Sequence, residues 1–462
     1  MQFVIALIGT RLLTTLLPPD EVGRIALITA ITAFFAMFLV NPVGMYINRH
    51  LHEWAEKGQI KFYFSIYWKY LLLVCAAAGS ICYILNYFEL ISVHTKKFWL
   101  LTLICGSLLF NTVNQTVIPS LNMLGYRNVF ILLTLATLIT GLISAFGLTQ
   151  AMQATAEYWL LGLLIGQAVF GWLGIKILYK RVAIAIPFAL GNHDQLVAQL
   201  WRYAWPVALA VGLGWVQMQG YRFILEKQVG LAILGLYFAG YGLSASLLTA
   251  FEMILTTYFQ PLLYKRVSMQ GVMFDAQAWN DYASAILPAL IFVTAAICIA
   301  SKEITAVMLG SSYQDAGRYV LLGALAEATR VLVGMVGLVA HLRLKTHWLL
   351  FPNFIGVLIT IGLIVFLVPV FGSGSAAVSV ALGGAFVAVT MYFFMRQKVL
   401  RLPWIKVLQA LFMAGIVYLC STVIRHLLGE NSDVFHALLF LGILGILSLP
   451  MLYILLRSHI KA

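Results

Sequence analysis

The chain has 462 residues, of which 62% are hydrophobic and 10% are charged, and its mean hydropathy is +0.96. A soluble domain carries about 25% charged residues, so this composition excludes a water-soluble globular protein and indicates a membrane protein. The formal net charge of +13 comes from Lys and Arg residues scattered between apolar runs, which argues against a nucleic-acid-binding stripe.

Apolar runs long enough to cross a bilayer follow one another along the chain. A spanning helix needs about 20 mainly apolar residues, and we therefore expect an all-α integral membrane protein of about 14 transmembrane helices. The expected helices are residues 2–17, 23–47, 62–88, 97–123, 128–149, 157–179, 203–225, 231–262, 282–300, 317–342, 347–369, 374–395, 404–425 and 434–456. The first run reaches about 24 Å at 1.5 Å per residue, which predicts either a short first helix or a start codon that lies upstream.

The basic residues between the runs predict an orientation. With a cytoplasmic N-terminus, the even-numbered connections and the C-terminal tail hold about twice as many Lys and Arg residues as the odd-numbered connections. Basic residues concentrate on the cytoplasmic side of membrane proteins. We therefore expect both termini in the cytoplasm.

The chain also repeats itself weakly. Residues 11–27 end one helix and turn at Gly23 into the next, and residues 222–239 follow the same course around Gly235. We interpret this as two six-helix halves in a parallel repeat, with a substrate cavity between them; a chance similarity of apolar hairpins is the alternative. The expected domains are an N-lobe (1–180), a C-lobe (181–398) and two additional C-terminal helices (399–462).

The residues of this repeat carry a resemblance to a known family. Arg11-Leu12-Leu13, Leu17-Pro18-Pro19 and Asp20-Glu21-Val22-Gly23 are similar to the first-helix motif of the polysaccharide-type flippases in the multidrug/oligosaccharidyl-lipid/polysaccharide exporter superfamily. Arg222-Phe223-Ile224-Leu225 and Gly235-Leu236-Tyr237 resemble the counterpart in the second half of that family. The expected number of helices agrees with the family along the full length.

The resemblance implies a flippase of the bacterial inner membrane. Its substrate would be an undecaprenyl-diphosphate-linked oligosaccharide repeat unit, moved by alternating access from the cytoplasmic to the periplasmic leaflet for O-antigen (lipopolysaccharide), capsule or exopolysaccharide biosynthesis. Membrane lipid, a polysaccharide polymerase and a chain-length regulator are the other implied partners. The alternatives are an ion-coupled exporter of the multidrug and toxin extrusion type, a lipid II flippase and, least favoured, a membrane polymerase or glycosyltransferase.

Such transport requires a wet, cationic cavity, so charged and amide side chains inside the spans are the candidate site residues. A charge near the bilayer centre costs about 2.5–3.5 kcal/mol on insertion scales and therefore faces a cavity or a partner. The substrate-binding candidates are Arg11, Arg330, Glu327, Arg222, Lys69, Asn111, Asn114 and Gln115. Glu252 is the lone acid of its helix and the candidate for ion coupling.

Each candidate has a structural alternative. Arg11, Arg222 and Lys69 can extend their charged ends to the membrane surface, and Arg11 can also pair with Asp20 or Glu21. The spacing of Glu327 and Arg330 predicts a pair on one helix face, either a gate or a static ion pair. The amides can hydrogen-bond neighbouring helices, and Glu252 can be a hydrogen-bonded structural acid.

Motifs of enzymes and of metal sites are missing from the sequence. There is no Walker A loop, HExxH or GxSxG motif, and we expect neither catalysis nor a cofactor. The five cysteines lie inside apolar runs without metal-ligand spacing, so we expect small core residues and no metal.

Overall fold

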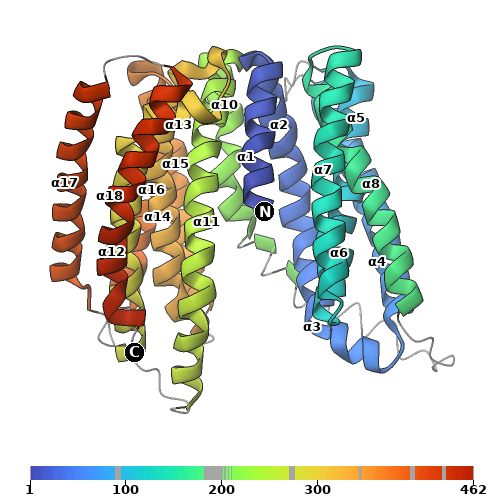
Figure 1. Cartoon of the computed structure of the whole chain (residues 1–462). Helices are drawn as coiled ribbons and strands as arrows, with labels where there is room; N and C mark the ends of the chain where they lie inside the picture. The colour runs from blue at the N-terminus through green and yellow to red at the C-terminus, as the bar shows by residue number, and fades with distance from the viewer. Residues whose placement is uncertain are drawn as a thin grey trace. The chain divides into compact units, whose positions relative to one another are not determined.

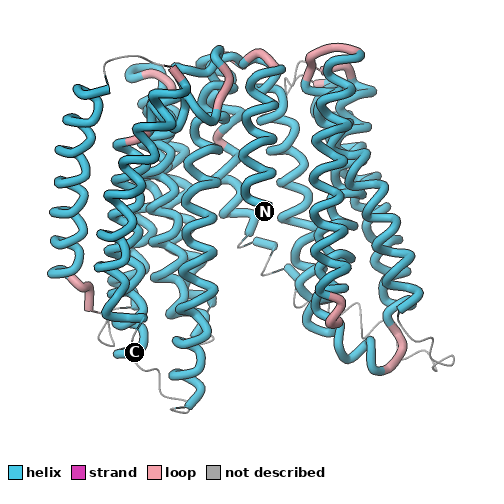
Figure 2. The backbone as a smooth tube through the Cα atoms, in the orientation of Figure 1, coloured by secondary structure: helices cyan, strands magenta, loops and turns pink. Residues whose placement is uncertain are grey.

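The computed structural model describes residues 2–88, 95–181, 201, 204–205, 208–209, 211–269, 276–342, 346–395, 401–428 and 433–460. In this part of the chain every regular element is a helix (Figure 2), so the all-α prediction is confirmed. Within the described residues, twelve helices are long and apolar enough to cross a membrane, and Gln2–Leu16 is a shorter apolar helix. Together they match every expected helix except residues 203–225, which lie partly outside the described residues.

The chain divides into two compact units, an N-terminal unit (Met1–Phe223) and a C-terminal unit (Ile224–Ala462). This division lies within one helix, later in the chain than the expected boundary at residue 180, and the assignment of repeat-related lobes stays a prediction.

The N-terminal unit is built from these elements: α1 (Gln2–Leu16), α2 (Pro19–Phe35), the π-helical turn η1 (Ala36–Val40), α3 (Asn41–Glu56), α4 (Ile60–Tyr87), α5 (Lys97–Gly106), the π-helical turn η2 (Ser107–Asn111), α6 (Thr112–Met123), α7 (Arg127–Ala151), α8 (Ala156–Arg181), the π-helical turn η3 (Val216–Gly220) and the start of α10 (Arg222–Val229). The turns η1 and η2 connect their flanking helices without a break, so that Pro19–Glu56 and Lys97–Met123 each form one candidate span.

The C-terminal unit follows with α11 (Leu231–Met269), α12 (Ala276–Ile299), α13 (Ser301–Met308), η4 (Ser311–Ala316), α14 (Gly317–Leu342), η5 (Thr346–Leu349), α15 (Leu350–Phe371), α16 (Gly374–Met395), α17 (Trp404–Leu428) and α18 (Val434–Ile460) (Figure 1). One core cluster joins α11, α12, α14 and α16, and a second joins α12, α17 and α18. Arg425 of α17 donates hydrogen bonds to both carboxylate oxygens of Glu303, at 2.8 and 3.1 Å, and thereby ties α17 to α13.

The predicted turns at Gly23 and Gly235 are wrong. The first turn lies at Leu17–Pro18, because Pro19 occupies the first position of α2, where its missing N–H leaves no bond unmade. Gly23 is buried inside α2. The second turn lies at Gly230, whose φ of +83° suits glycine, and Gly235 is inside α11.

Close packing of α7 against α8, which lie side by side in Figure 1, depends on small residues. A Cβ atom at Gly162 would overlap backbone atoms of Ser144 and Ala145, whereas a Cβ atom at Gly147 would have no neighbour within 4 Å. Lipid supplies no hydrophobic force between helices, so such close backbone contacts supply the packing attraction.

We predict that Gly162→Ala lowers the free energy of unfolding by about 1–3 kcal/mol, because the added methyl group forces α7 and α8 apart. Gly147→Ala is the matched control and should be neutral or stabilising, since alanine favours a helix by about 0.5–1 kcal/mol over glycine. Unfolding of the purified protein in mixed micelles measures both. Equal stability of the two variants would contradict the packing argument.

Candidate functional site

An ion network in the C-terminal unit brings together three of the predicted site residues. Arg330 of α14 donates from Nε to Glu327 Oε2 at 2.6 Å and from Nη2 to Glu252 Oε2 of α11 at 2.9 Å. Thr249 Oγ1 lies 3.3 Å from the same Nη2 atom. The predicted pairing of Glu327 with Arg330 is confirmed, and Glu252 lies with them; the roles given to these residues stay predictions.

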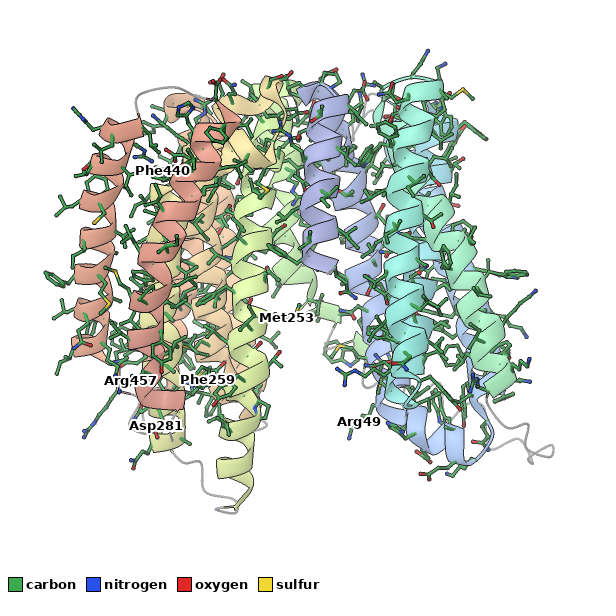
Figure 3. The ribbon with its side chains drawn as sticks, in the orientation of Figure 1. Arg49, Met253, Phe259, Asp281, Phe440 and Arg457 are labelled. Carbon is green, nitrogen blue, oxygen red and sulfur yellow. The ribbon has the colours of Figure 1, made fainter. Side chains whose placement is uncertain are left out.

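The local structure explains why these side chains meet. Glu327 and Arg330 are one helical turn apart and share a face of α14, and this face meets α11. Gly323 allows the approach, because a Cβ atom there would press on Ser244 and Tyr241. Figure 3 labels Met253, the residue after Glu252, part way along α11. The network therefore lies inside a candidate span and not at a helix end.

The two carboxylates differ in burial and in partners. The side chain of Glu327 is 6% exposed and accepts a second hydrogen bond from Tyr241 Oη at 2.9 Å. The side chain of Glu252 is 25% exposed and borders a cavity of about 230 Å³ that Thr256, Gln260 and Tyr282 also line. Glu327 is thus a fixed partner of Arg330, and Glu252 is the partner that a ligand or proton can reach.

With both acids ionised, the network carries one positive and two negative charges. An arginine in this state does not attract an anion, because two carboxylates already compensate its charge. Protonation or displacement of one acid would free guanidinium donors for another acceptor, such as a phosphate oxygen. The arrangement can therefore link proton or cation binding to anion binding.

The other predicted basic residues are not part of this network. Arg11 is half-buried on α1, and Arg222 of α10 donates to the carbonyl oxygen of Ala26 at 3.5 Å. Lys69 is exposed on α4, an arrangement that suits a side chain reaching for the membrane surface.

The three predicted amides have different surroundings. Asn114 donates to the carbonyl oxygens of Phe110 and Gln167, at 2.9 and 2.6 Å, and accepts from Thr137 at 3.2 Å. It thus joins α6 to α7 and α8, so its hydrogen-bonding groups serve helix packing. Gln115 is exposed and Asn111 is half-buried at the end of η2.

Sequence reasoning missed two polar arrangements. Glu21 pairs with Arg24 at 3.0 Å and accepts from the backbone N–H of Ala156 at 2.8 Å, so it stabilises the first turn of α8. Tyr241 was not identified as a partner of Glu327. The spacing of Glu21 and Arg24 was a readable signal, whereas no local pattern indicates the contact of Tyr241 with Glu327 across helices.

No cluster of three or more His, Cys, Asp or Glu side chains able to hold a metal ion occurs among the described residues. All five cysteines are free thiols. Cys75 and Cys105 make weak hydrogen bonds to each other's carbonyl oxygen, at 3.7 and 3.5 Å, between α4 and α5. These thiols serve packing.

We predict that Arg330→Met destabilises the protein by up to about 3 kcal/mol, because it leaves two carboxylates without their cation inside the span. The loss should shrink when Glu327→Gln is added, since the most buried charge is then removed as well. Lys57→Met breaks the exposed pair of Lys57 and Glu53 and should leave stability close to that of the wild type, because solvent screens such a pair. Thermal unfolding in micelles measures all of these variants, and a stable Arg330→Met variant would exclude a tight network.

Comparisons with known proteins identify the fold. No protein-family model and no curated protein sequence matches the chain. Among solved structures, the chain is similar to the lipid II flippase MurJ in an inward closed conformation, with a TM-score of 0.72, 14% sequence identity and coverage of 99% of this chain and 97% of MurJ. It is also similar to an inward-facing multidrug resistance MATE family transporter of the MOP superfamily, with a TM-score of 0.61, 12% identity and coverage of 86% of this chain and 94% of the transporter. The chain is thus a multi-pass membrane protein with the fold that MurJ and MATE transporters share.

Proposed function

We propose that the protein is a flippase that moves an undecaprenyl-diphosphate-linked oligosaccharide repeat unit from the cytoplasmic to the periplasmic leaflet of the bacterial inner membrane. The observation that carries the proposal is Arg330, held inside a membrane span by Glu327 and Glu252. The similarity of the chain's fold to that of a lipid flippase supports a lipid-linked substrate. The likeness of residues 11–27 to polysaccharide-type flippases favours a glycan repeat unit over lipid II. Because transport of this kind makes and breaks no covalent bond, we propose that the protein acts as a transporter and not as an enzyme.

In the proposed mechanism, Glu327 holds Arg330 in place and Glu252 controls its availability. A proton on Glu252 weakens the contact with Nη2, and the freed donor can bind a phosphate oxygen of the substrate. Loss of that proton restores the contact and favours release of the diphosphate. Arg11, half-buried on α1, is the second proposed phosphate ligand, and the amides Asn111 and Gln115 are proposed contacts for sugar hydroxyl groups.

The charge of the network favours one alternative function. Two carboxylates and one guanidinium leave a net negative site, which suits a cationic drug and an exchanged proton. An ion-coupled multidrug exporter is therefore the second candidate, and the similarity to the fold of a MATE transporter agrees with it.

We predict that a strain lacking this protein accumulates complete lipid-linked repeat units on the cytoplasmic side of the membrane and loses surface polysaccharide. Charge reversal by Arg11→Glu or Arg330→Glu should fail to restore export at normal membrane levels, whereas Lys57→Glu, at an exposed pair, should restore it. Unpolymerised units in the periplasm would instead indicate that the protein is a polymerase. In the proposed function, a polymerase and a chain-length regulator are separate partner proteins. Unchanged glycans with altered drug sensitivity would indicate the exporter.

We also predict that Glu252→Gln removes the pH dependence of translocation. The side chain of glutamine does not titrate, so the contact of Arg330 with residue 252 would be the same at every pH. Translocation of a fluorescent lipid-linked oligosaccharide into proteoliposomes at several pH values measures the effect. Glu53→Gln is the matched control, since Glu53 pairs with Lys57 outside the network and its loss should leave the pH profile unchanged. A Glu252→Gln variant with the wild-type profile would exclude Glu252 as the coupling acid.

A further inference from the structure

The N-terminal unit contains an apolar cavity that the proposed function does not use. Its volume is about 460 Å³, within the range of about 300–1,000 Å³ that is typical of ligand pockets. Aromatic side chains supply much of its wall: Phe38, Tyr46, Trp54, Tyr63, Tyr67, Tyr70, Trp201 and Trp205. Leu39, Val43 and Ile66 are among the aliphatic lining residues.

Two contacts fix the walls of this cavity. Tyr70 Oη of α4 donates to the carbonyl oxygen of Leu39 at 2.8 Å, within the π-helical turn η1. The rings of Trp54 and Tyr63 stack with centroids 3.9 Å apart, where α3 turns into α4. A π-helical turn leaves carbonyl groups without regular helical partners, and the bond from Tyr70 satisfies one of them. The cavity is therefore a built feature of η1, α3 and α4.

The chemistry of the wall selects a hydrocarbon occupant. The hydroxyl of Tyr70 is used in the bond to Leu39, and that of Tyr67 shares a hydrogen bond with Thr116 at 3.2 Å. The rest of the wall is made mainly of ring faces and aliphatic groups. A buried water needs two to four polar partners, so water is a poor occupant and a lipid chain a good one.

Charges near the cavity select the headgroup of that lipid. Arg49 lies one helical turn after Tyr46 of the cavity wall; it is exposed on α3 and labelled in Figure 3. The acid on the next turn, Glu53, is paired with Lys57 at 2.6 Å. Lys61 lies 5.8 Å from the ring centroid of Tyr179, so the basic end of α8, with Lys176, Lys180 and Arg181, lies beside the start of α4. Basic residues next to a membrane attract anionic headgroups.

We propose that this cavity binds a hydrocarbon chain of an anionic phospholipid, with the lipid phosphate at Arg49. The phospholipid surrounds the protein at high concentration, so mass action favours its occupancy over that of a rare lipid. The bound chain packs against Phe38 and Leu39 of η1 and supports the irregular turn. This site is independent of the ion network on α11 and α14.

Native mass spectrometry of the full-length protein, with phosphatidylglycerol or phosphatidylcholine of identical chains, tests the proposal. The wild-type protein should retain phosphatidylglycerol in preference to phosphatidylcholine. Val43→Trp and Ile66→Trp fill the cavity from two different helices and should each reduce retention at least tenfold. Leu72→Trp, at an exposed position of α4 away from the cavity, is the matched control and should retain lipid as the wild type does.

Arg49→Gln should reduce the preference for phosphatidylglycerol about fivefold, corresponding to ~1 kcal/mol for one basic residue at a membrane surface, and leave phosphatidylcholine unaffected. Unfolding temperatures near the wild-type value show that the variants are folded. Retention by both cavity-filling variants equal to that of Leu72→Trp would overturn the proposal. Displacement of phosphatidylglycerol by an equimolar polyprenyl diphosphate would overturn it as well, by assigning the cavity to a prenyl lipid.

Discussion

Hydrocarbon accepts no hydrogen bonds and solvates no charge, and this constraint governs both units. Backbone groups are satisfied within helices, and several hydroxyl side chains donate to the helix that carries them, as Thr32 does to Ile28 at 2.9 Å and Ser379 to Ser375 at 2.7 Å. The ionised groups of the network on α11 and α14 meet the same requirement through partners, and Glu327, the more buried of its two acids, has two. A charge retained in such surroundings costs free energy, so its retention points to a use beyond packing.

The proposed role of the ion network depends on the unequal burial of its two acids, Glu252 and Glu327. If Glu252 and Glu327 were equally buried, the network would be a static tie between α11 and α14. The cavity beside Glu252 and the hydrogen bond from Tyr241 to Glu327 make one contact of Arg330 exchangeable and the other permanent. In the proposed mechanism, Nε of Arg330 stays bound to Glu327 while Nη2 exchanges Glu252 for a ligand, so the guanidinium keeps its position.

The sequence predicts the helices well because span length and hydropathy are local properties that the bilayer imposes on each segment. It also predicts the pair of Glu327 and Arg330, which depends on one helical turn. The sequence did not predict contacts between helices. Glu252 contacts Arg330 although 78 residues separate them, and no local pattern near either residue indicates the contact. Asn114 and Gln115 illustrate the same limit, because adjacent residues point about 100° apart around a helix, and only the packing of α7 and α8 decides that Asn114 is the one used for a tie. The turns were misplaced at Gly23 and Gly235 because glycine is also common inside membrane-spanning helices, where these two residues lie.

The two units carry different chemistry on similar all-helical scaffolds. In the N-terminal unit the half-buried amide of Asn114 is committed to helix packing, and the cavity beside η1 has an aromatic, apolar wall. In the C-terminal unit the cavity beside Glu252 is bordered by an acid, a threonine and a glutamine. A lipid flippase and a drug transporter share the fold of this chain, so the fold alone leaves the substrate open. The substrate therefore has to be inferred from local charge. In the proposed mechanism, the arginine held by two acids is exposed only when an anionic substrate and a proton are both present.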